Sequence, residues 1–245
     1  MRSGVKASIM ITCLGDLFFP EVGVAMVTVL RRLGVTVDFP EGQTCCGMPL
    51  FNSGYRDEAV RVAERTVRLF AAAEHVVVPS GSCAWMLKTE YPSLLKHDGA
   101  LRAAAESLAA RTRELSQFIV EVLGVTRVES DFAGRVTYHD SCHLLRGLGE
   151  SRAPRTLLRN VAGVELVELP GANECCGFGG SFSVRLPEVS TAILDKKLGN
   201  VEGTGAGCLV ACDAGCLMQM GGGLSRRASR VRPLHLAQVL AGGRP

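Results

Sequence analysis

The sequence is poor in aromatic residues and in clustered charge. Aromatic residues make up 5% of the 245 positions, the net charge is +3, and no run of Lys and Arg is interleaved with aromatics. Nucleic-acid binding is therefore not expected, because it needs a basic surface and side chains on which bases can stack. No apolar run approaches the roughly 18 residues that a membrane-spanning helix requires, so any membrane contact is expected to be peripheral and to run through partner proteins.

Several familiar motifs are also missing. The sequence has neither a Ser–His–Asp order nor a Walker pattern, and the glycines at 203, 205 and 207 precede a predicted strand instead of following one. A dinucleotide-binding fingerprint requires the opposite order. The paired Cys-x-x-Cys knuckles that are typical of structural zinc sites do not occur either. These absences argue against the common hydrolases, P-loop NTPases and dinucleotide-binding enzymes.

The sequence does contain ten cysteines. Residues 1–13 imitate a signal peptide only faintly, because their apolar part is short, no small-residue cleavage site follows, and Asp16 comes soon after. We therefore interpret this segment as a first buried strand. Ten cysteines without a secretion signal predict a reducing, cytoplasmic location, where clustered thiols indicate metal or redox chemistry instead of structural disulfides.

Apolar periodicity divides the chain into alternating strands and helices. Strands are predicted at residues 9–11, 35–39, 75–79, 135–139, 164–169, 208–211 and 231–233. Helices are predicted at residues 20–33, 57–73, 80 to about 92, about 100–123, 152–161, about 187–198 and 235–240. Gly221, Gly222 and Gly223 are interpreted as a loop. Strands that alternate with helices indicate parallel sheets with right-handed crossovers.

The second half of the chain repeats the order of the first. Residues 76–83 align with residues 209–216 without a gap, and the cysteines have nearly the same spacing in both halves. We therefore expect an α/β protein of two Rossmann-like parallel-sheet repeats, residues 1–124 and 125–245, related by approximate two-fold symmetry. Open α/β sheets bind ligands at the carboxyl ends of their strands, so the cysteines are expected there.

Two Cys-Cys-Gly motifs, at residues 45–47 and 175–177, mark the same place in each repeat. Adjacent thiols compete for one small space, and the glycine lets the backbone approach a bulky inorganic partner. Matching the two halves groups eight of the cysteines into one quartet per repeat. The first quartet is Cys13, Cys45, Cys46 and Cys83, and the second is Cys142, Cys175, Cys176 and Cys216.

Four thiolates can hold a tetrahedral zinc ion or an iron–sulfur cluster. Ligands that come from several loops with small residues around them favour the larger object, and the amides of Gly177, Gly179 and Gly180 can approach cluster sulfides. An iron–sulfur cluster in at least one repeat is the leading hypothesis. Zinc in one repeat and a purely thiol–disulfide role stay open as alternatives.

Three polar residues flank Cys142. His139 and His143 have helical spacing and could ligate a metal ion. The simpler interpretation is that they, with Asp140, cap the turn and hydrogen-bond around the centre.

Cys208 and Cys212 have no cysteine counterparts in the first half, where His75 and Pro79 align with them. We expect both to be small buried residues at a strand. Cys212 lies four residues before Cys216, so it is also a candidate substitute ligand.

With these motifs the chain resembles the cysteine-rich "CCG domain" family of iron–sulfur proteins. That family includes the cysteine-rich component of heterodisulfide reductase and the iron–sulfur components of glycolate oxidase and anaerobic glycerol-3-phosphate dehydrogenase. The resemblance covers nearly the whole chain. It rests on residues 13–23, 39–47, 79–83, 138–144, 174–180 and 213–218.

The resemblance implies an electron-transfer subunit of a complex that oxidises L-lactate to pyruvate, with partners similar to lactate utilization proteins B and C. The chain lacks the Cys-x-x-Cys-x-x-Cys ferredoxin segment of larger members, so a partner is expected to supply it. Alternatives are a subunit of another 2-hydroxy-acid or glycerol-3-phosphate dehydrogenase, or a disulfide reductase. A non-enzymatic alternative is a zinc-stabilised scaffold.

One departure from the family pattern concerns its final cysteines. The fuller pattern ends each repeat in Cys-x-x-Cys, which gives five cysteines able to hold a non-cubane cluster that splits disulfides. Ser80 and Asp213 stand at the first position of each pair. By this resemblance, four ligands per repeat fit a closed [4Fe-4S] cluster that passes one electron at a time, and argue against disulfide chemistry. Ser80 or Asp213 could still offer an oxygen ligand.

Overall fold

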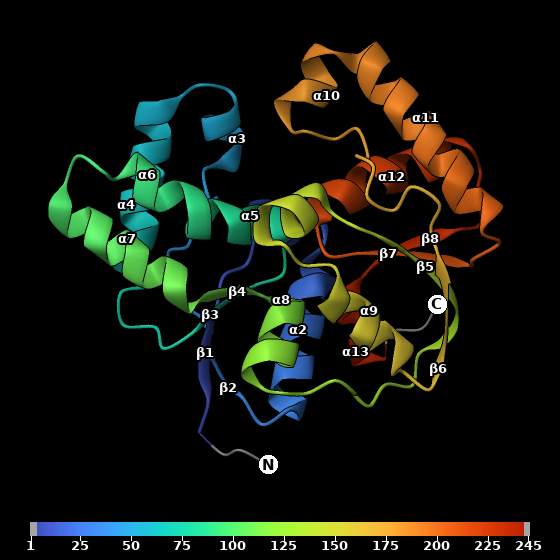
Figure 1. Cartoon of the computed structure of the whole chain (residues 1–245), viewed down its shortest axis with the longest axis horizontal. Coiled ribbons are helices and arrows are strands. Elements are labelled where there is room, and N and C mark those ends of the chain that lie inside the picture. Colours follow the sequence, from blue (N-terminus) through green and yellow to red (C-terminus); the bar gives the residue numbers. More distant parts are fainter. Residues whose placement is uncertain (1–3, 243–245) are drawn as a thin grey trace.

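The computed structural model describes residues 4–242 and contains two sheets of four parallel strands (Figure 1). The strand order is β2-β1-β3-β4 in one sheet and β6-β5-β7-β8 in the other, so both sheets have one topology. The fold is therefore α/β with two Rossmann-like repeats, as the alternation of strands and helices predicts. The strands are β1 (Lys6–Ile9), β2 (Thr36–Asp38), β3 (Val76–Val78), β4 (Thr112–Glu114), β5 (Ala133–His139), β6 (Gly163–Glu168), β7 (Cys208–Ala211) and β8 (Arg232–His235).

Helices connect the strands and cover the sheets. In the first half they are α1 (Cys13–Phe18), α2 (Pro20–Arg32), α3 (Met48–Asn52), α4 (Arg56–Leu69), α5 (Gly81–Trp85), the π-helical segment η1 (Met86–Glu90), α6 (Tyr91–Leu94), α7 (Gly99–Arg111), α8 (Leu115–Gln117) and the π-helical segment η2 (Phe118–Val122). In the second half they are the π-helical segment η3 (His143–Gly147), α9 (Arg152–Arg159), α10 (Ser181–Arg185), α11 (Pro187–Gly203), α12 (Ala214–Arg226) and α13 (Leu236–Ala241). Within residues 4–242, no helix combines the length and the apolar character needed to cross a membrane.

One central strand of each sheet is buried along its whole length. All residues of β3 and of β7 are buried, and such continuous apolar runs are typical of parallel strands with both faces covered. Strand β1 pairs in parallel with β2 and β3, and β5 pairs in the same way with β6 and β7. The carboxyl ends of three strands therefore meet at one edge of each sheet, and the cysteine loops begin there.

Reciprocal helix contacts relate the two halves by an approximate two-fold axis. Helix α2 of the first half packs on α13 of the second, and α9 of the second half packs on α8 of the first. Nearer the axis, α5 packs on η3 and α1 packs on α12. Figure 1 shows α2, α8, α9 and α13 gathered in the middle of the molecule. Each half therefore completes the packing of the other.

One hydrophobic core runs through both halves. It contains Met26 and Leu30 of α2, Phe118 of η2, Tyr138 of β5 and Leu240 of α13, all of them fully buried. Two smaller clusters each lie within one half, around α4 in the first and between α11 and α12 in the second. The largest apolar cluster thus lies at the junction of the repeats.

The prediction of one helix over residues 100–123 is wrong. Helix α7 ends at Arg111, and the next three residues form β4, an edge strand that pairs with β3. Thr112 and Glu114 are buried, and the Thr112 hydroxyl donates to the carbonyl of Leu108 at 2.8 Å. The local sequence is rich in helix formers, but pairing with β3 and burial outweigh that modest propensity.

The prediction of a loop at Gly221, Gly222 and Gly223 is also wrong, because all three lie within α12. A Cβ atom at Gly223 would lie 2.5 Å from Cδ1 of Leu198, and one at Gly221 would lie 3.0 Å from Cγ of Pro233. These glycines therefore let α12 pack closely against α11 and β8.

The short elements α1, α3, η3 and α10 were not predicted, and further differences concern element ends. The helix predicted at 57–73 ends at Leu69, and the one predicted from residue 80 continues past Pro92, through η1 into α6. The first strand is β1, slightly before the predicted 9–11, and residues 1–3 of the segment interpreted as a strand lie outside the described residues.

Candidate metal centre

Both cysteine quartets face one cavity between the two halves of the molecule. The cavity has a volume of about 200 Å³, and all eight quartet cysteines line it. Residues of α3 and α10, which lie across from each other in Figure 1, line it as well. The sequence predicts two quartets at the carboxyl ends of two sheets, and the structure adds that both quartets face a common space.

In the first half the sulfurs form two close pairs. The Sγ atoms of Cys13 and Cys45 lie 3.6 Å apart, and those of Cys46 and Cys83 lie 3.1 Å apart. Cys13 begins α1 after β1, the adjacent pair lies in the loop after β2, and Cys83 lies in α5 after β3. Three strand ends of one sheet therefore supply the first quartet.

The second half arranges its sulfurs in the same order. The sulfurs of Cys176 and Cys216 lie within 4.8 Å of each other, and the neighbouring Cys175 thiol raises the pKa of Cys142. Cys142 precedes η3, the adjacent pair lies in the loop between β6 and α10, and Cys216 lies in the first turn of α12. The correspondence between the repeats thus extends from sequence spacing to the elements that carry the cysteines.

Each Cys-Cys-Gly turn depends on its glycine. Gly47 and Gly177 have φ angles of +86° and +89°, a left-handed conformation that other residues adopt at a cost. In this conformation the Gly47 amide donates to Cys45 Sγ at 3.4 Å, and the Gly177 amide donates to Cys175 Sγ at 3.3 Å. The turn therefore aims one backbone N–H at a sulfur of each quartet.

The loop of the first quartet is held by two side chains whose roles the sequence did not predict. Gln43 donates to the carbonyl of Ile9 at 2.9 Å and accepts from the amide of Ile11 at 3.0 Å, so it ties the loop to β1. The Tyr91 hydroxyl donates to the carbonyl of Cys46 at 2.9 Å. Glutamine and tyrosine are common residues, and only the tertiary contact identifies these two.

Cys45 and Cys175 carry the stabilised thiolates. The hydrogen bond from the Cys13 thiol lowers the pKa of Cys45 to about 3, and the one from the Cys142 thiol lowers the pKa of Cys175 to about 2. The same bonds raise the pKa of both donors above its ordinary value. Thiols this close share protons, and a metal displaces those protons when it binds.

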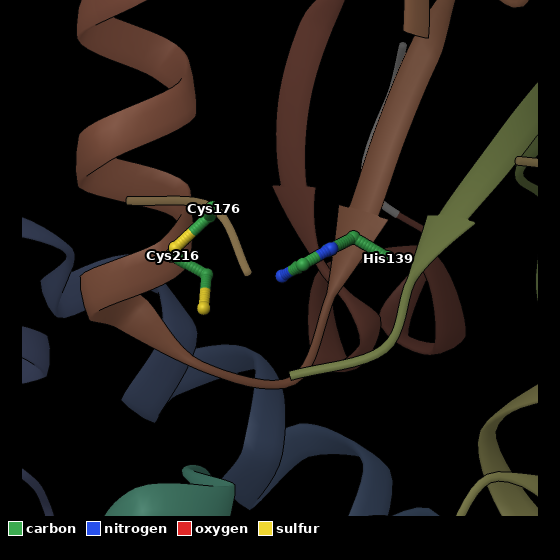
Figure 2. A group of neighbouring side chains, drawn as sticks. All are labelled: His139, Cys176 and Cys216. Carbon is green, nitrogen blue, oxygen red and sulfur yellow. The ribbon is translucent and has the colours of Figure 1, made fainter. Parts of the chain in front are cut away.

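The spread of the sulfurs tests which metal group fits. Four thiolates around one zinc ion, at about 2.3 Å each, would lie about 3.8 Å from one another. Among residues 4–242, the one group of three metal-binding side chains whose ligand atoms all lie within 4.8 Å is His139, Cys176 and Cys216 (Figure 2). No three sulfurs of one quartet lie that close together, and this spread fits a polynuclear centre better than a single ion.

Ser80 and Asp213 meet where the two halves touch. The Ser80 hydroxyl donates to Asp213 Oδ2 at 3.0 Å, and the Ser82 amide donates to the same oxygen at 3.0 Å. Ser80 also accepts from the Cys83 amide, and Asp213 Oδ1 accepts from the Gly215 amide. Both residues line the cavity, but their oxygen atoms already cap the helices that carry the last cysteine of each quartet.

Asp140 and His143 have different surroundings. Arg155 binds both carboxylate oxygens of Asp140, at 2.7 and 2.8 Å, so Asp140 forms a buried ion pair behind the site. His143 lines the cavity, its Nδ1 atom lies 3.8 Å from Cys142 Sγ, and its ring packs against Trp85 at 4.9 Å. Arg155 is a further supporting residue that sequence reasoning did not single out.

His139 lies deeper, at the end of β5, with 1% of its surface exposed. Neither ring nitrogen has a hydrogen-bond partner in the described part of the chain. Figure 2 shows the ring extending from the strand toward Cys176 and Cys216. The second quartet therefore has a buried imidazole without a hydrogen-bond partner next to two of its thiols.

The two remaining cysteines lie away from the cavity. Cys208 is buried in β7, where it pairs in register with Val136 and Arg232. Cys212 is fully buried, and its sulfur accepts from the Tyr138 hydroxyl at 3.6 Å. The structure therefore brings neither of them into a quartet.

The chain has relatives among known proteins, both by domain and over its full length. The cysteine-rich domain (CCG) model matches residues 8–88 and 136–221, once in each half. The chain is 50% identical over 236 residues to lactate utilization protein A of Geobacillus kaustophilus (strain HTA426), which covers 96% of this chain and 98% of that protein. It is 44% identical over 239 residues to lactate utilization protein A 2 of Bacillus cereus (strain Q1), covering 98% and 99% of the two chains.

A solved structure shares the fold. A hypothetical protein from Helicobacter pylori matches with a TM-score of 0.66 at 11% identity, over 96% of this chain and 48% of that one. The chain thus spans about half the length of that structure, and the likeness concerns the fold alone. The two domain matches and the full-length relatives agree with the paired cysteine quartets described above. The chain belongs to the cysteine-rich domain (CCG) family and carries two copies of its domain.

Proposed function

We propose that the protein is an iron–sulfur electron-transfer subunit with a role in lactate utilization. The observation that carries this proposal is the convergence of two cysteine quartets on one cavity. Cys13, Cys45, Cys46 and Cys83 would hold one [4Fe-4S] cluster, and Cys142, Cys175, Cys176 and Cys216 would hold a second. Such clusters supply reversible one-electron storage when bound.

The surrounding residues support electron transfer more than disulfide chemistry. Splitting a disulfide at a cluster requires an accessible extra ligand position. In this chain Ser80 and Asp213 stand at the corresponding positions, and their oxygen atoms are engaged with each other and with helix N-termini. The amides of Gly47 and Gly177 donate to ligand sulfurs, and such hydrogen bonds adjust the potential of a centre.

The substrate and partners are proposed from the relatives. Proteins named lactate utilization protein A match this chain from end to end. Oxidation of L-lactate to pyruvate releases two electrons and two protons, and two one-electron centres can accept the two electrons in turn. We propose partners similar to lactate utilization proteins B and C, with a ferredoxin-type segment on a partner, and a cytoplasmic complex.

The decisive experiment is metal and sulfide quantification on anaerobically purified protein, followed by iron and sulfide reconstitution and EPR. We expect about eight iron atoms per chain, thiolate-to-iron absorption, and EPR signals on reduction. Protein that takes up neither iron nor sulfide would overturn the proposal. L-Lactate-dependent reduction of the assembled complex, compared with glycolate and glycerol 3-phosphate, then tests the substrate.

A zinc centre in the second repeat is the alternative that one observation favours. His139, Cys176 and Cys216 form a compact group of three ligand atoms, which is a donor set that zinc accepts. One equivalent of zinc per chain, with iron and sulfide for only one cluster, would support this alternative and contradict two clusters.

A further inference from the structure

The two quartets differ at one position that the repeat makes comparable. His139 lies three residues before Cys142, and Met10 lies three residues before Cys13. Both residues are buried, with 1% of their surface exposed, and both stand at the end of the central strand that leads to the first cysteine of a quartet. The first quartet therefore has an apolar thioether where the second has an imidazole.

The surroundings of His139 point to the sulfurs as its partners. A buried N–H without a partner costs about 1–3 kcal/mol, so native structures rarely leave one unpaired. Neither nitrogen of His139 bonds to another protein group in residues 4–242, and the neighbouring Asp140 carboxylate is bound by Arg155. The ring extends toward Cys176 and Cys216, whose sulfurs lie within 4.8 Å of it and of each other (Figure 2).

We propose that His139 donates an N–H···S hydrogen bond to the thiolate of Cys216 in the loaded protein and so makes the second centre the more easily reduced of the two. This inference rests on the proposed iron–sulfur function. A hydrogen bond to a ligand sulfur withdraws electron density, which stabilises the reduced, more negative state. Met10 has no hydrogen to donate, so the first centre lacks this contribution.

Other hydrogen-bond donors and charged groups also lie near the two quartets. The Gly47 and Gly177 amides donate to equivalent sulfurs in both repeats, so they cancel in the comparison. The Asp213 carboxylate would disfavour reduction, but it accepts hydrogen bonds from Ser80, Ser82 and Gly215 that disperse its charge. The buried Lys197 ammonium also interacts with thiols of the second quartet and favours reduction there. His139 adds a hydrogen-bond donor that the first quartet lacks at the equivalent position. An arriving electron is therefore expected to occupy the second centre first.

The test uses the internal repeat to choose its variants. The full-length protein is reconstituted as wild type, His139→Met and His139→Gln, and its centres are titrated by EPR at controlled potentials. Adding Cys45→Ser to each variant removes the first centre, so that the signal of the second can be assigned. We expect His139→Met to keep its iron and to shift the potential of the second centre downward, toward that of the first. His139→Gln, which keeps an N–H donor, should recover part of the shift.

The other possible results distinguish failure of the hydrogen-bond proposal from failure of the proposed iron–sulfur function. An unchanged potential in His139→Met would overturn the proposal. Loss of one centre's iron from either His139 variant would also overturn it, because His139 would then be a ligand. Wild-type protein that binds no cluster would instead refute the proposed function itself. The reverse variant, Met10→His, should raise the potential of the first centre if its iron content is retained.

Discussion

Adjacent cysteines in each Cys-Cys-Gly turn occupy different surroundings. Cys45 and Cys175 are partly exposed to the cavity, whereas Cys46 and Cys176 are buried. Burial and hydrogen bonding to neighbouring thiols raise the pKa of Cys46 and Cys176, and the glycine amide supports the thiolate of the residue before each of them. One turn therefore supplies a quartet with one partly exposed and one buried sulfur.

Serine substitutions distinguish the proposed ligand cysteines from a cysteine that lies away from the cavity. We expect Cys175→Ser and Cys176→Ser each to lose the iron of the second centre, because each removes one of four thiolates. Cys208→Ser is the matched control, since Cys208 is a cysteine of the same half that lies in β7 away from the cavity. Iron and sulfide analysis after reconstitution measures the effect. Full iron content in either of the first two variants would refute the ligand assignment.

Glu114 and His235 are equivalent residues with opposite chemistry. Each is the last residue of the fourth strand of its sheet, in register with Val78 and Ala211 respectively, and each caps the next helix through a capping box. Both are fully buried. Burial raises the pKa of Glu114 to about 7 and lowers the pKa of His235 to about 4, because each neutral form is favoured.

These shifts predict opposite pH dependences of stability. The unfolded Glu114 carboxyl ionises near pH 4.5 and the folded one near 7, so stability is lost as pH rises through that window, by up to about 3 kcal/mol. The free energy of unfolding of Glu114→Gln, measured with guanidinium under anaerobic conditions, should therefore rise relative to that of the wild type as pH increases from 5 to 8. His235 has the opposite effect, because its pKa is lower in the folded protein. Stability is therefore lost as pH falls from about 6.5 to 4. A constant difference between Glu114→Gln and wild type across pH 5–8 would contradict the buried titration.

At the scale of elements, α12 shows how closely packed helices use glycine. Gly221, Gly222 and Gly223 follow one another, yet only two of them face neighbouring elements closely. A Cβ atom at Gly222 would have Arg226 Nη1 as its nearest neighbour, at 3.6 Å. Three identical residues therefore have different roles, set by the faces of one helix.

Alanine at two of these positions should have effects of opposite sign. Gly222→Ala is expected to stabilise the protein by about 0.5–1 kcal/mol, because alanine is the better helix former and the site has room. Gly223→Ala should destabilise it by about 1–3 kcal/mol, since the new methyl would overlap Leu198. Chemical denaturation of both variants measures the difference. Equal effects would mean that the segment is not a helix packed on α11.

The elements that the sequence predicted correctly are those with strong local patterns. The helix at α2 begins at Pro20 and ends near Gly34, and the β-branched run at 35–39 contains β2. Local pattern failed at β4, whose strand conformation depends on pairing with β3, and at the three glycines of α12, which depend on contact with α11. Both errors arise where a distant part of the chain decides the local conformation.

The candidate site likewise has features that local sequence predicts and features that depend on tertiary contacts. Spacing and repetition alone are enough to group the quartet cysteines. They cannot place both quartets on one cavity, because that depends on how the halves dock. They also cannot show that Arg155 binds Asp140 or that Gln43 holds the first loop. These contacts join separate elements of the fold, and no sequence pattern names the partner that each side chain binds.

For the whole molecule, the position of the main core predicts cooperative unfolding. That core combines α2 and η2 of the first half with β5 and α13 of the second, so separated halves would expose it. The boundary between residues 124 and 125 therefore stays a prediction about repeats and not about independent folding units.

A single transition should follow from this shared core. We expect far-UV circular dichroism, the fluorescence of Trp85 and the absorption of the bound centres to report coincident unfolding. Trp85 suits the test because it is the one tryptophan of the chain and packs on His143 of the other half. Two separated transitions would show that the repeats unfold independently.

The contact between Ser80 and Asp213 bears on how such a molecule can arise. An assembly of two identical chains places the same side chain on both sides of its rotation axis. Serine would then face serine, or two buried carboxylates would repel each other. Joining the copies in one polypeptide frees each side to change alone, so that a hydroxyl can face a carboxylate. A single chain with two fused repeats can therefore place two different, complementary side chains across the axis. A symmetric dimer of identical chains cannot.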